Sequence, residues 1–315
     1  MGNYITIDGG TTNTRVNLMT DGAIAAAENI RLGNKDCVEG NGALKAALRE
    51  KIQGLLSRCA ITEQGICAVL ASGMITSEYG LHQVPHITAP AGIAELHAAM
   101  ARVSMPEITS VPFCFIPGIK TDADNLENAD IMRGEETEII GLLHYAPAGY
   151  VCVLPGSHSK HIFLDETGHI TAFRTMMTGE MISAMAFNTI LRGTVRLDMD
   201  GFDPDFLLKG YDYCVKNGIS NALFKTRILK NIFGKNDLEN YSFFLGALLA
   251  PELEALKGCG RPGVVIGGRS QLKNAMEHIL KMRGDMDVVC VPDEAVDRCV
   301  PEGAVKIFEY GKTGR

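Results

Sequence analysis

The chain has 315 residues, 46% hydrophobic and 21% charged, a composition that excludes a disordered or low-complexity protein. Thirty basic and 37 acidic residues give a net charge of −7, which argues against nucleic acid as the main partner. The longest apolar stretch, near residues 243–250, is far shorter than the roughly 20 residues that a membrane helix requires. This length predicts two domains.

The nine cysteines form no CxxC pair and are odd in number, so neither a disulfide framework nor a zinc site is expected. Reduced thiols are typical of the cytoplasm. No basic leader precedes Asp8, and we therefore expect no signal peptide. The sequence predicts a cytoplasmic protein without a membrane or nucleic-acid partner.

The first half begins with a strand, a polar turn and a second strand, over residues 4–7, 8–15 and 16–19. A short strand near residues 23–28 and a helix over 42–58 follow, the helix indicated by leucines and isoleucine at helical spacing. The later elements expected in this half are a buried strand over 66–71, a helix over 90–100 and an apolar run over 112–117. That run ends in Pro117-Gly118, so we place the domain boundary there, with domains at residues 1–118 and 119–315.

The second half repeats the strand–turn–strand pattern over residues 150–164, and a further strand is expected over 169–173. Residues 180–258 have a mostly helical pattern. The remaining expected elements are a strand at 264–266, a helix at 271–281, a strand at 288–291 and a closing helix within 294–310. The pattern leaves open whether the closing helix packs back on the first domain.

Turns rich in glycine and hydroxyl groups between two strands present N–H and O–H groups that suit phosphate oxygens. Asp8 at the end of the first strand could hold Mg²⁺ through water, although a hairpin turn with an exposed aspartate would look the same. Two such turns and a later strand–Gly-Gly–helix unit predict a nucleotide held between two related α/β domains. The predicted nucleotide-binding residues are Gly9, Gly10, Thr11, Thr12 and Asn13, then Gly156, Ser157, His158 and Ser159. Gly267 and Gly268 could approach the adenosine, although a plain strand-to-helix turn would look similar.

Several longer motifs carry a family resemblance. They are Asp8–Arg15, Ser72-Gly73-Met74-Ile75, Asp130–Thr137, Pro155–Lys160, Met177-Thr178-Gly179-Glu180, Leu223–Arg227, Phe244–Leu248 and Ile266-Gly267-Gly268. The first resembles the phosphate loop of the actin–hexokinase–Hsp70 superfamily, and together they resemble the 2-dehydro-3-deoxygalactonokinase family across nearly the whole chain. Leu81 and His161 stand where that family usually has tryptophan, and Ser157 where it usually has threonine.

The resemblance implies two related ribonuclease-H-like domains of the actin/hexokinase type, with a nucleotide cleft between them. It also implies ATP- and Mg²⁺-dependent phosphorylation of 2-dehydro-3-deoxy-D-galactonate at C6, giving the 6-phosphate in galactonate catabolism. The alternatives are a kinase for another sugar or a pantothenate-like hydroxy acid, and a non-catalytic regulator or actin-like ATPase module. The oligomeric state stays open, with a homodimer among the alternatives.

A sugar kinase needs a carboxylate that orients the acceptor hydroxyl and takes its proton. Asp130 is the candidate, expected at a helix N-terminus because a helical run follows it, although a helix cap would have the same pattern. Asp8 is the rival base. Arg133, three residues after Asp130 and so expected on the same helical turn, could bind the substrate carboxylate through a bidentate contact.

The other candidates for substrate binding follow the motifs. Arg15, Glu135 and Lys160 offer charges, and the alternative for each is a solvated surface group. The family resemblance adds Ser72, Gly73, Met74, Gly179 and Glu180.

Overall fold

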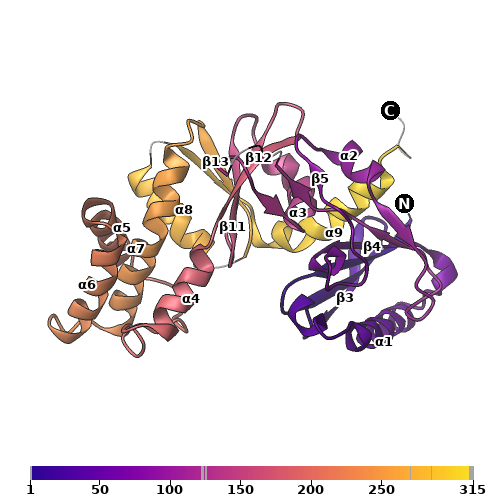
Figure 1. The fold of residues 1–315 in the computed structure, drawn as a ribbon, viewed down its shortest axis with the longest axis horizontal. Helices are drawn as coiled ribbons and strands as arrows, with labels where there is room; N and C mark the ends of the chain where they lie inside the picture. The colour runs from indigo at the N-terminus through magenta and orange to yellow at the C-terminus, as the bar shows by residue number, and fades with distance from the viewer. Residues whose placement is uncertain (1, 122–123, 125, 270, 285, 312–315) are drawn as a thin grey trace. The chain divides into compact units, whose positions relative to one another are not determined.

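Figure 1 shows the computed structural model of the chain, which describes residues 2–121, 124, 126–269, 271–284 and 286–311. Its contacts define two compact units. The first contains Met1–His144, Asp165–Ala172 and Glu294–Arg315, and the second contains Tyr145–Leu164 and Phe173–Asp293. The boundary expected at residue 118 lies inside the first unit, and nearly all of the closing helix belongs to that unit.

The main sheet of the first unit has the strand order β3-β2-β1-β4-β7-β6. The strands are β1 (Asn3–Gly9), β2 (Thr14–Thr20), β3 (Ala23–Ile30), β4 (Ile66–Gly73), β6 (Ala101–Val103) and β7 (Phe113–Phe115). The chain turns back antiparallel from β1 to β2 and from β2 to β3, whereas β4 runs parallel to β1 and to β7. Helix α1 (Gly42–Arg58) buries Leu48 and Ile52 in the same core as Ile5 and Ile7 of β1.

The first unit also contains a small sheet with the strand order β5-β8-β9. Its strands are β5 (Ile87–Thr88), β8 (Ile119–Lys120) and β9 (Ile131–Met132), and the helices besides α1 are α2 (Ile93–Ala98), α3 (Glu135–Leu142) and α9 (Asp293–Glu309).

Helices α3 and α9 lie side by side (Figure 1) and cross at backbone contact. A Cβ on Gly141 of α3 would lie 1.9 Å from the Cys299 carbonyl oxygen, and a Cβ on Gly303 of α9 would lie 2.0 Å from the Thr137 carbonyl oxygen. The Tyr4 hydroxyl of β1 also donates a hydrogen bond to Glu309 at 2.6 Å. Only glycine permits such close approach, so α9 is an integral part of the first unit.

The sheet of the second unit has the order β12-β11-β10-β13-β14. Its strands are β10 (Val151–Leu154), β11 (Ser159–Leu164), β12 (Ile170–Met176), β13 (Gly263–Ile266) and β14 (Asp287–Cys290). As in the first unit, an antiparallel hairpin leads into parallel strands, since β10 pairs antiparallel with β11 and parallel with β13. Both sheets therefore share the ribonuclease-H-like order, and the predicted α/β fold class is confirmed.

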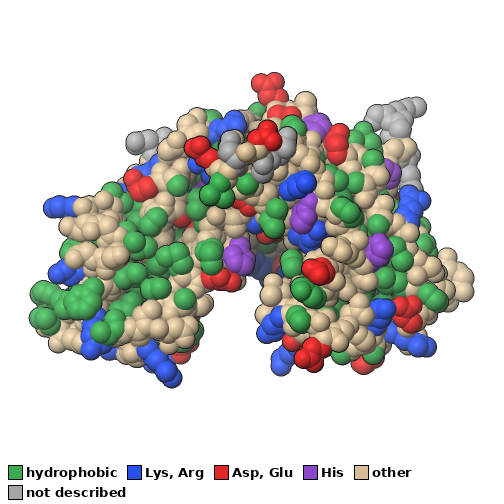
Figure 2. Space-filling view, in the orientation of Figure 1, with side chains coloured by type: hydrophobic (Ala, Val, Ile, Leu, Met, Phe, Trp, Pro, Cys, Tyr) green, Lys and Arg blue, Asp and Glu red, His purple; other side chains and the backbone are tan. Residues whose placement is uncertain are grey.

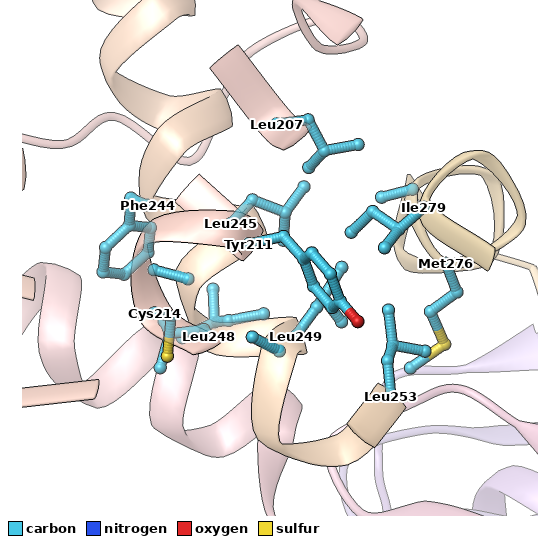
Figure 3. Close-up of a cluster of buried hydrophobic side chains, with 14 of the residues drawn as sticks. Leu207, Tyr211, Cys214, Phe244, Leu245, Leu248, Leu249, Leu253, Met276 and Ile279 are labelled. Atoms are coloured by element: carbon cyan, nitrogen blue, oxygen red, sulfur yellow. The ribbon is translucent and has the colours of Figure 1, made fainter. Parts of the chain in front are cut away.

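The helices described alongside this second sheet are α4 (Thr178–Asn188), α5 (Pro204–Asn217), α6 (Ile219–Asn231), α7 (Asp237–Lys257) and α8 (Gln271–Arg283). The core formed by α5, α7 and α8 is drawn in Figure 3, where Tyr211 lies among Leu245, Leu249, Met276 and Ile279. Residues 189–203 interrupt the helical pattern expected over 180–258.

Exposed hydrophobic side chains gather at the left of Figure 2, in the region of α6. Phe224 of α6 and Ile232 and Phe233, which follow the helix, are exposed. Within the described ranges, no helix combines the length and the apolar character that crossing a membrane would need.

Candidate functional site

The first predicted phosphate loop joins β1 to β2 and is held by backbone hydrogen bonds. The Gly10 N–H donates to the Asn13 carbonyl at 2.8 Å. The carbonyls of Gly10 and Thr11 accept N–H groups from residues 34 and 35, each at 3.1 Å. The side chains of Thr11, Thr12 and Asn13 are exposed, so an anchored backbone presents two hydroxyls and an amide to a ligand.

Asp8 lies at the carboxyl end of β1, directly opposite Ser72 of the parallel strand β4. The side chain of Ser72 is only 1% exposed, yet its hydroxyl has no hydrogen-bond partner among the described residues. The Arg15 guanidinium lies 3.7 Å from the Asp8 carboxylate. Burial raises the pKa of Asp8, and the charge of Arg15 opposes that shift. An unsatisfied buried hydroxyl beside a carboxylate is the kind of group that a bound ligand or water completes.

The N-terminus of α3 abuts these strand ends. Gly134 has φ +114° and would place a Cβ 3.1 Å from the Gly73 Cα. Gly73 itself has φ +80°, and its Cβ would lie 2.5 Å from the Gly9 carbonyl oxygen. Met74 follows at the start of a 3₁₀ turn. The positive end of the α3 dipole is thereby brought next to Gly9 and Gly73, where it favours an anion.

Helix α3 begins with three carboxyl groups. Glu135 accepts the Arg133 N–H at 2.9 Å. Glu136 is completely buried and accepts the Gly134 N–H at 2.8 and 2.9 Å, and burial followed by the charge of Glu135 raises its pKa to about 8. Burial, then the charges of Asp8 and Glu135, raise the pKa of Glu138 to about 7. Sequence reasoning missed Glu138, although its position three residues after Glu135 places it on the same face of the helix.

The helix N-terminus expected at Asp130 is wrong. Asp130 directly precedes strand β9, and α3 begins only at Glu135. One carboxylate oxygen of Asp130 accepts the Ile131 N–H at 2.7 Å, and the side chain is partly exposed. Antiparallel pairing of β9 with β8 keeps residues 131–132 extended, so the helix starts after Gly134. Asp130 and Arg133 therefore do not share a helical turn.

The Arg133 guanidinium holds the segment between β4 and β5. It donates to the carbonyls of Thr76 and Val84 at 2.8 and 3.0 Å, and to the Thr76 hydroxyl. His86 Nδ1 lies 3.2 Å from the same group. Burial, then the charges of Arg133 and Lys120, lower the pKa of His86 to about 4, so the ring is neutral at pH 7 and Nδ1 accepts. A substrate-binding role for Arg133 stays a prediction.

The second predicted phosphate turn, residues 155–158 (below, the second phosphate turn), joins β10 to β11. The Gly156 N–H donates to the Ser159 hydroxyl at 3.4 Å, and Ser157 and His158 are exposed. Lys160, by contrast, is buried, and its ammonium donates to the Thr175 hydroxyl at 2.6 Å. The turn thus offers exposed groups at its tip, while its base is packed into the second unit.

Two other predicted segments lie against this turn. At the start of α4, a Cβ on Gly179 would lie 2.3 Å from the Gly156 carbonyl oxygen, and the Glu180 N–H donates to the Ser157 carbonyl at 3.2 Å. The Glu180 carboxylate also lies 3.2 Å from the His158 ring.

On another side of the turn, the Gly267 N–H donates to the Val153 carbonyl at 2.8 Å. Gly268 has φ +72° and would place a Cβ 3.2 Å from the Pro155 carbonyl oxygen. The second unit therefore brings together Gly156–Ser159, Gly179, Glu180, Gly267 and Gly268.

Comparison with known proteins identifies the family. A model of the 2-keto-3-deoxy-galactonokinase family matches residues 8–306. A protein of Rhizobium meliloti (strain 1021), named a probable 2-dehydro-3-deoxygalactonokinase, is 28% identical over 303 residues, which are 94% of this chain and 94% of the relative. A protein of Escherichia coli (strain K12) named 2-dehydro-3-deoxygalactonokinase is 35% identical over 115 residues, 36% of this chain and 35% of the relative.

The crystal structure of a Sinorhizobium meliloti protein provisionally named 2-dehydro-3-deoxygalactonokinase matches this chain with a TM-score of 0.81 and 24% sequence identity. The match covers 98% of both chains and shows that the fold is shared. Because the family model spans most of the sequence, the chain belongs to the 2-keto-3-deoxy-galactonokinase family and is a carbohydrate kinase.

Proposed function

We propose that this enzyme transfers the γ-phosphoryl group of ATP to the C6 hydroxyl of 2-dehydro-3-deoxy-D-galactonate, giving the 6-phosphate and ADP in galactonate catabolism. The observation that carries the proposal is the match of the family model over residues 8–306. The nine cysteines are all free thiols, which agrees with a cytoplasmic enzyme.

We assign nucleotide binding to three segments whose backbone and hydroxyl groups can contact the ligand. Residues Gly9–Asn13 and Gly156–Ser159 would bind phosphate oxygens through N–H and hydroxyl groups, and Gly267-Gly268 would approach the adenosine. These segments have the chemistry that phosphoryl transfer requires, because its catalysis consists mainly of positioning and charge stabilisation.

Mg²⁺ fits the end of β1. Asp8 offers a carboxylate oxygen, and the unsatisfied Ser72 hydroxyl beside it can accept a hydrogen bond from a metal-bound water. Among the described residues no group of three His, Cys, Asp or Glu side chains could hold a metal. The ion would therefore keep several waters and phosphate oxygens, as Mg²⁺ commonly does in kinases. It would neutralise charge on the transferring phosphoryl group.

Two carboxyl groups are candidates for orienting the acceptor hydroxyl. The sequence pattern favours Asp130. Glu138 is the second candidate, because it interacts electrostatically with Asp8 at the proposed metal site. The substrate is assigned to Arg15, Ser72, Gly73, Met74, Arg133, Glu135, Lys160, Gly179 and Glu180.

An ADP-release assay over a panel of 2-keto-3-deoxy sugar acids and neutral hexoses tests the substrate. We expect the galactonate derivative to be preferred over glucose or galactose by up to ~10⁴-fold in kcat/KM, because a neutral sugar leaves the carboxylate-binding group unpaired. Comparable kcat/KM for neutral hexoses would refute the substrate class. Absence of ADP with every compound would favour a non-catalytic regulator.

The same assay on Asp130→Asn and Glu138→Gln separates the two carboxyl candidates. Loss of the orienting base should lower kcat by ~10²–10⁴-fold while ATP binding persists. If Asp130→Asn kept the wild-type kcat, Asp130 would have no role in orienting the acceptor hydroxyl and would only cap the backbone of β9.

A further inference from the structure

A buried polar cluster in the second unit is unexplained by the roles assigned above. Glu252 of α7 and His161 of β11 are each 2% exposed, and Glu252 Oε1 lies 3.1 Å from His161 Nε2. The hydroxyl of buried Thr178 donates to the other oxygen, Glu252 Oε2. Removing a carboxylate from water is costly unless it is paired and hydrogen-bonded, and here both oxygens have partners.

The two partners of Glu252 belong to the two flanks of the second phosphate turn. His161 follows Lys160 in β11, two residues after Ser159, whose hydroxyl accepts the Gly156 N–H. Thr178 is the first residue of α4 and immediately precedes Gly179 and Glu180, which touch the turn. One carboxylate therefore fixes both the strand that leaves the turn and the helix start that covers it.

The helix that supplies this carboxylate is firmly held. Leu249 and Leu253, on either side of Glu252 in the sequence, are fully buried and lie with Tyr211, Met276 and Ile279 in the core of Figure 3. Glu252 thus projects from a rigid element. The start of α4 reaches the turn directly, because a Cβ on Gly179 would lie 2.3 Å from the Gly156 carbonyl oxygen.

We propose that Glu252, acting through His161 and Thr178, is a positioning residue that sets the second phosphate turn in place before the nucleotide binds. Its own side chain is buried away from solvent, so its effect reaches the nucleotide through the turn. Preorganised N–H groups bind an anion without the cost of ordering the backbone at that moment. The inference rests on the proposed ATP-dependent function.

Thr178→Val is the most direct variant, since it removes one hydroxyl at nearly constant shape and leaves the Glu252–His161 pair intact. We expect Kd and KM for Mg-ATP to rise about tenfold, the order of effect of a lost hydrogen bond to a charged group. KM for the sugar acid should change much less. Thr178→Ser restores the hydroxyl and should return both ATP constants to near the wild-type values.

A matched control lies two residues along the same helix. The Glu254 carboxylate accepts the Tyr211 hydroxyl and lies 2.7 Å from the Lys257 ammonium, remote in sequence and contacts from the turn. Glu254→Gln should lower the urea midpoint without changing Kd for Mg-ATP. Glu252→Gln, which replaces the charged acceptor, should weaken ATP binding.

Calorimetric measurement of Mg-ATP binding and steady-state kinetics on these variants test the positioning role of Glu252. Unchanged ATP constants in Thr178→Val and Glu252→Gln, with a wild-type enzyme that binds and uses ATP, would overturn the positioning role alone. A wild-type protein that binds no ATP would overturn both this inference and the proposed function. A rise in the ATP constants that Thr178→Ser reverses, and that Glu254→Gln does not reproduce, would support the positioning role.

Discussion

Gly179→Ala tests how closely α4 approaches the second phosphate turn. The added Cβ would lie 2.3 Å from the Gly156 carbonyl oxygen and 2.7 Å from the Ser157 Cα. Ordinary contacts between carbon atoms are about 3.5–4.0 Å, so helix and turn must separate by about 1 Å. Both neighbouring atoms belong to the backbone, and no side-chain rotation can relieve the contact.

The expected energy has two opposing parts. Overpacking of this kind costs about 1–3 kcal/mol, and rigid backbone on both sides favours the upper end. Alanine also gains up to about 1 kcal/mol over glycine inside a helix. Gly54→Ala isolates this gain, because a Cβ at that position in α1 would meet no described atom within 4 Å.

Urea unfolding and the KM for ATP provide independent measurements. Gly179→Ala should have a free energy of unfolding lower than that of Gly54→Ala by about 2–3 kcal/mol, together with a raised KM for ATP. Gly54→Ala should be slightly more stable than wild type with an unchanged KM. If the two variants were equally stable with the same KM, the close contact between α4 and the turn would be refuted.

Glu136→Gln should make stability less dependent on pH. The pKa of Glu136 is raised from 4.5 to about 8 in the folded protein, so between these values the folded state keeps a proton that the unfolded state loses, and the free energy of unfolding falls as pH rises. Urea midpoints from pH 5 to 8 should show a shallower fall in the variant, and an equal slope would contradict the assignment. Arg133→Lys should lower the free energy of unfolding by about 2–4 kcal/mol, because lysine cannot reproduce the guanidinium contacts to Thr76, Val84 and His86. A raised KM for the sugar acid without loss of stability would instead assign the guanidinium to the substrate.

Elements with strong local patterns were predicted well from the sequence. The helix expected over 42–58 matches α1, and both strand–turn–strand patterns are antiparallel hairpins. Apolar spacing and glycine-rich turns are properties of neighbouring residues, so a single sequence reveals them.

Features that depend on distant partners were missed. The two-residue strand β9 forms because it pairs with β8. This pairing keeps the residues after Asp130 extended, so Asp130 does not begin a helix as expected. The high pKa of Glu138 and the unsatisfied hydroxyl of Ser72 arise from strands and helices that meet only in the fold. The assignment of residues 165–172 to the first unit likewise has no local signal.

The close crossing of α3 and α9 at Gly141 and Gly303 affects the order in which the first unit folds during synthesis. Domains generally fold as units during synthesis, beginning at the N-terminus. Here the helix that contacts Gly141 and Tyr4 is encoded after the whole second unit. The nascent chain therefore carries β1 and α3 without their contacts to α9 until α9 leaves the ribosome. Cys299 of α9 interacts electrostatically with Asp8 and Glu138, so the carboxyl end of β1 acquires its final surroundings only at that point, although its loop is translated first.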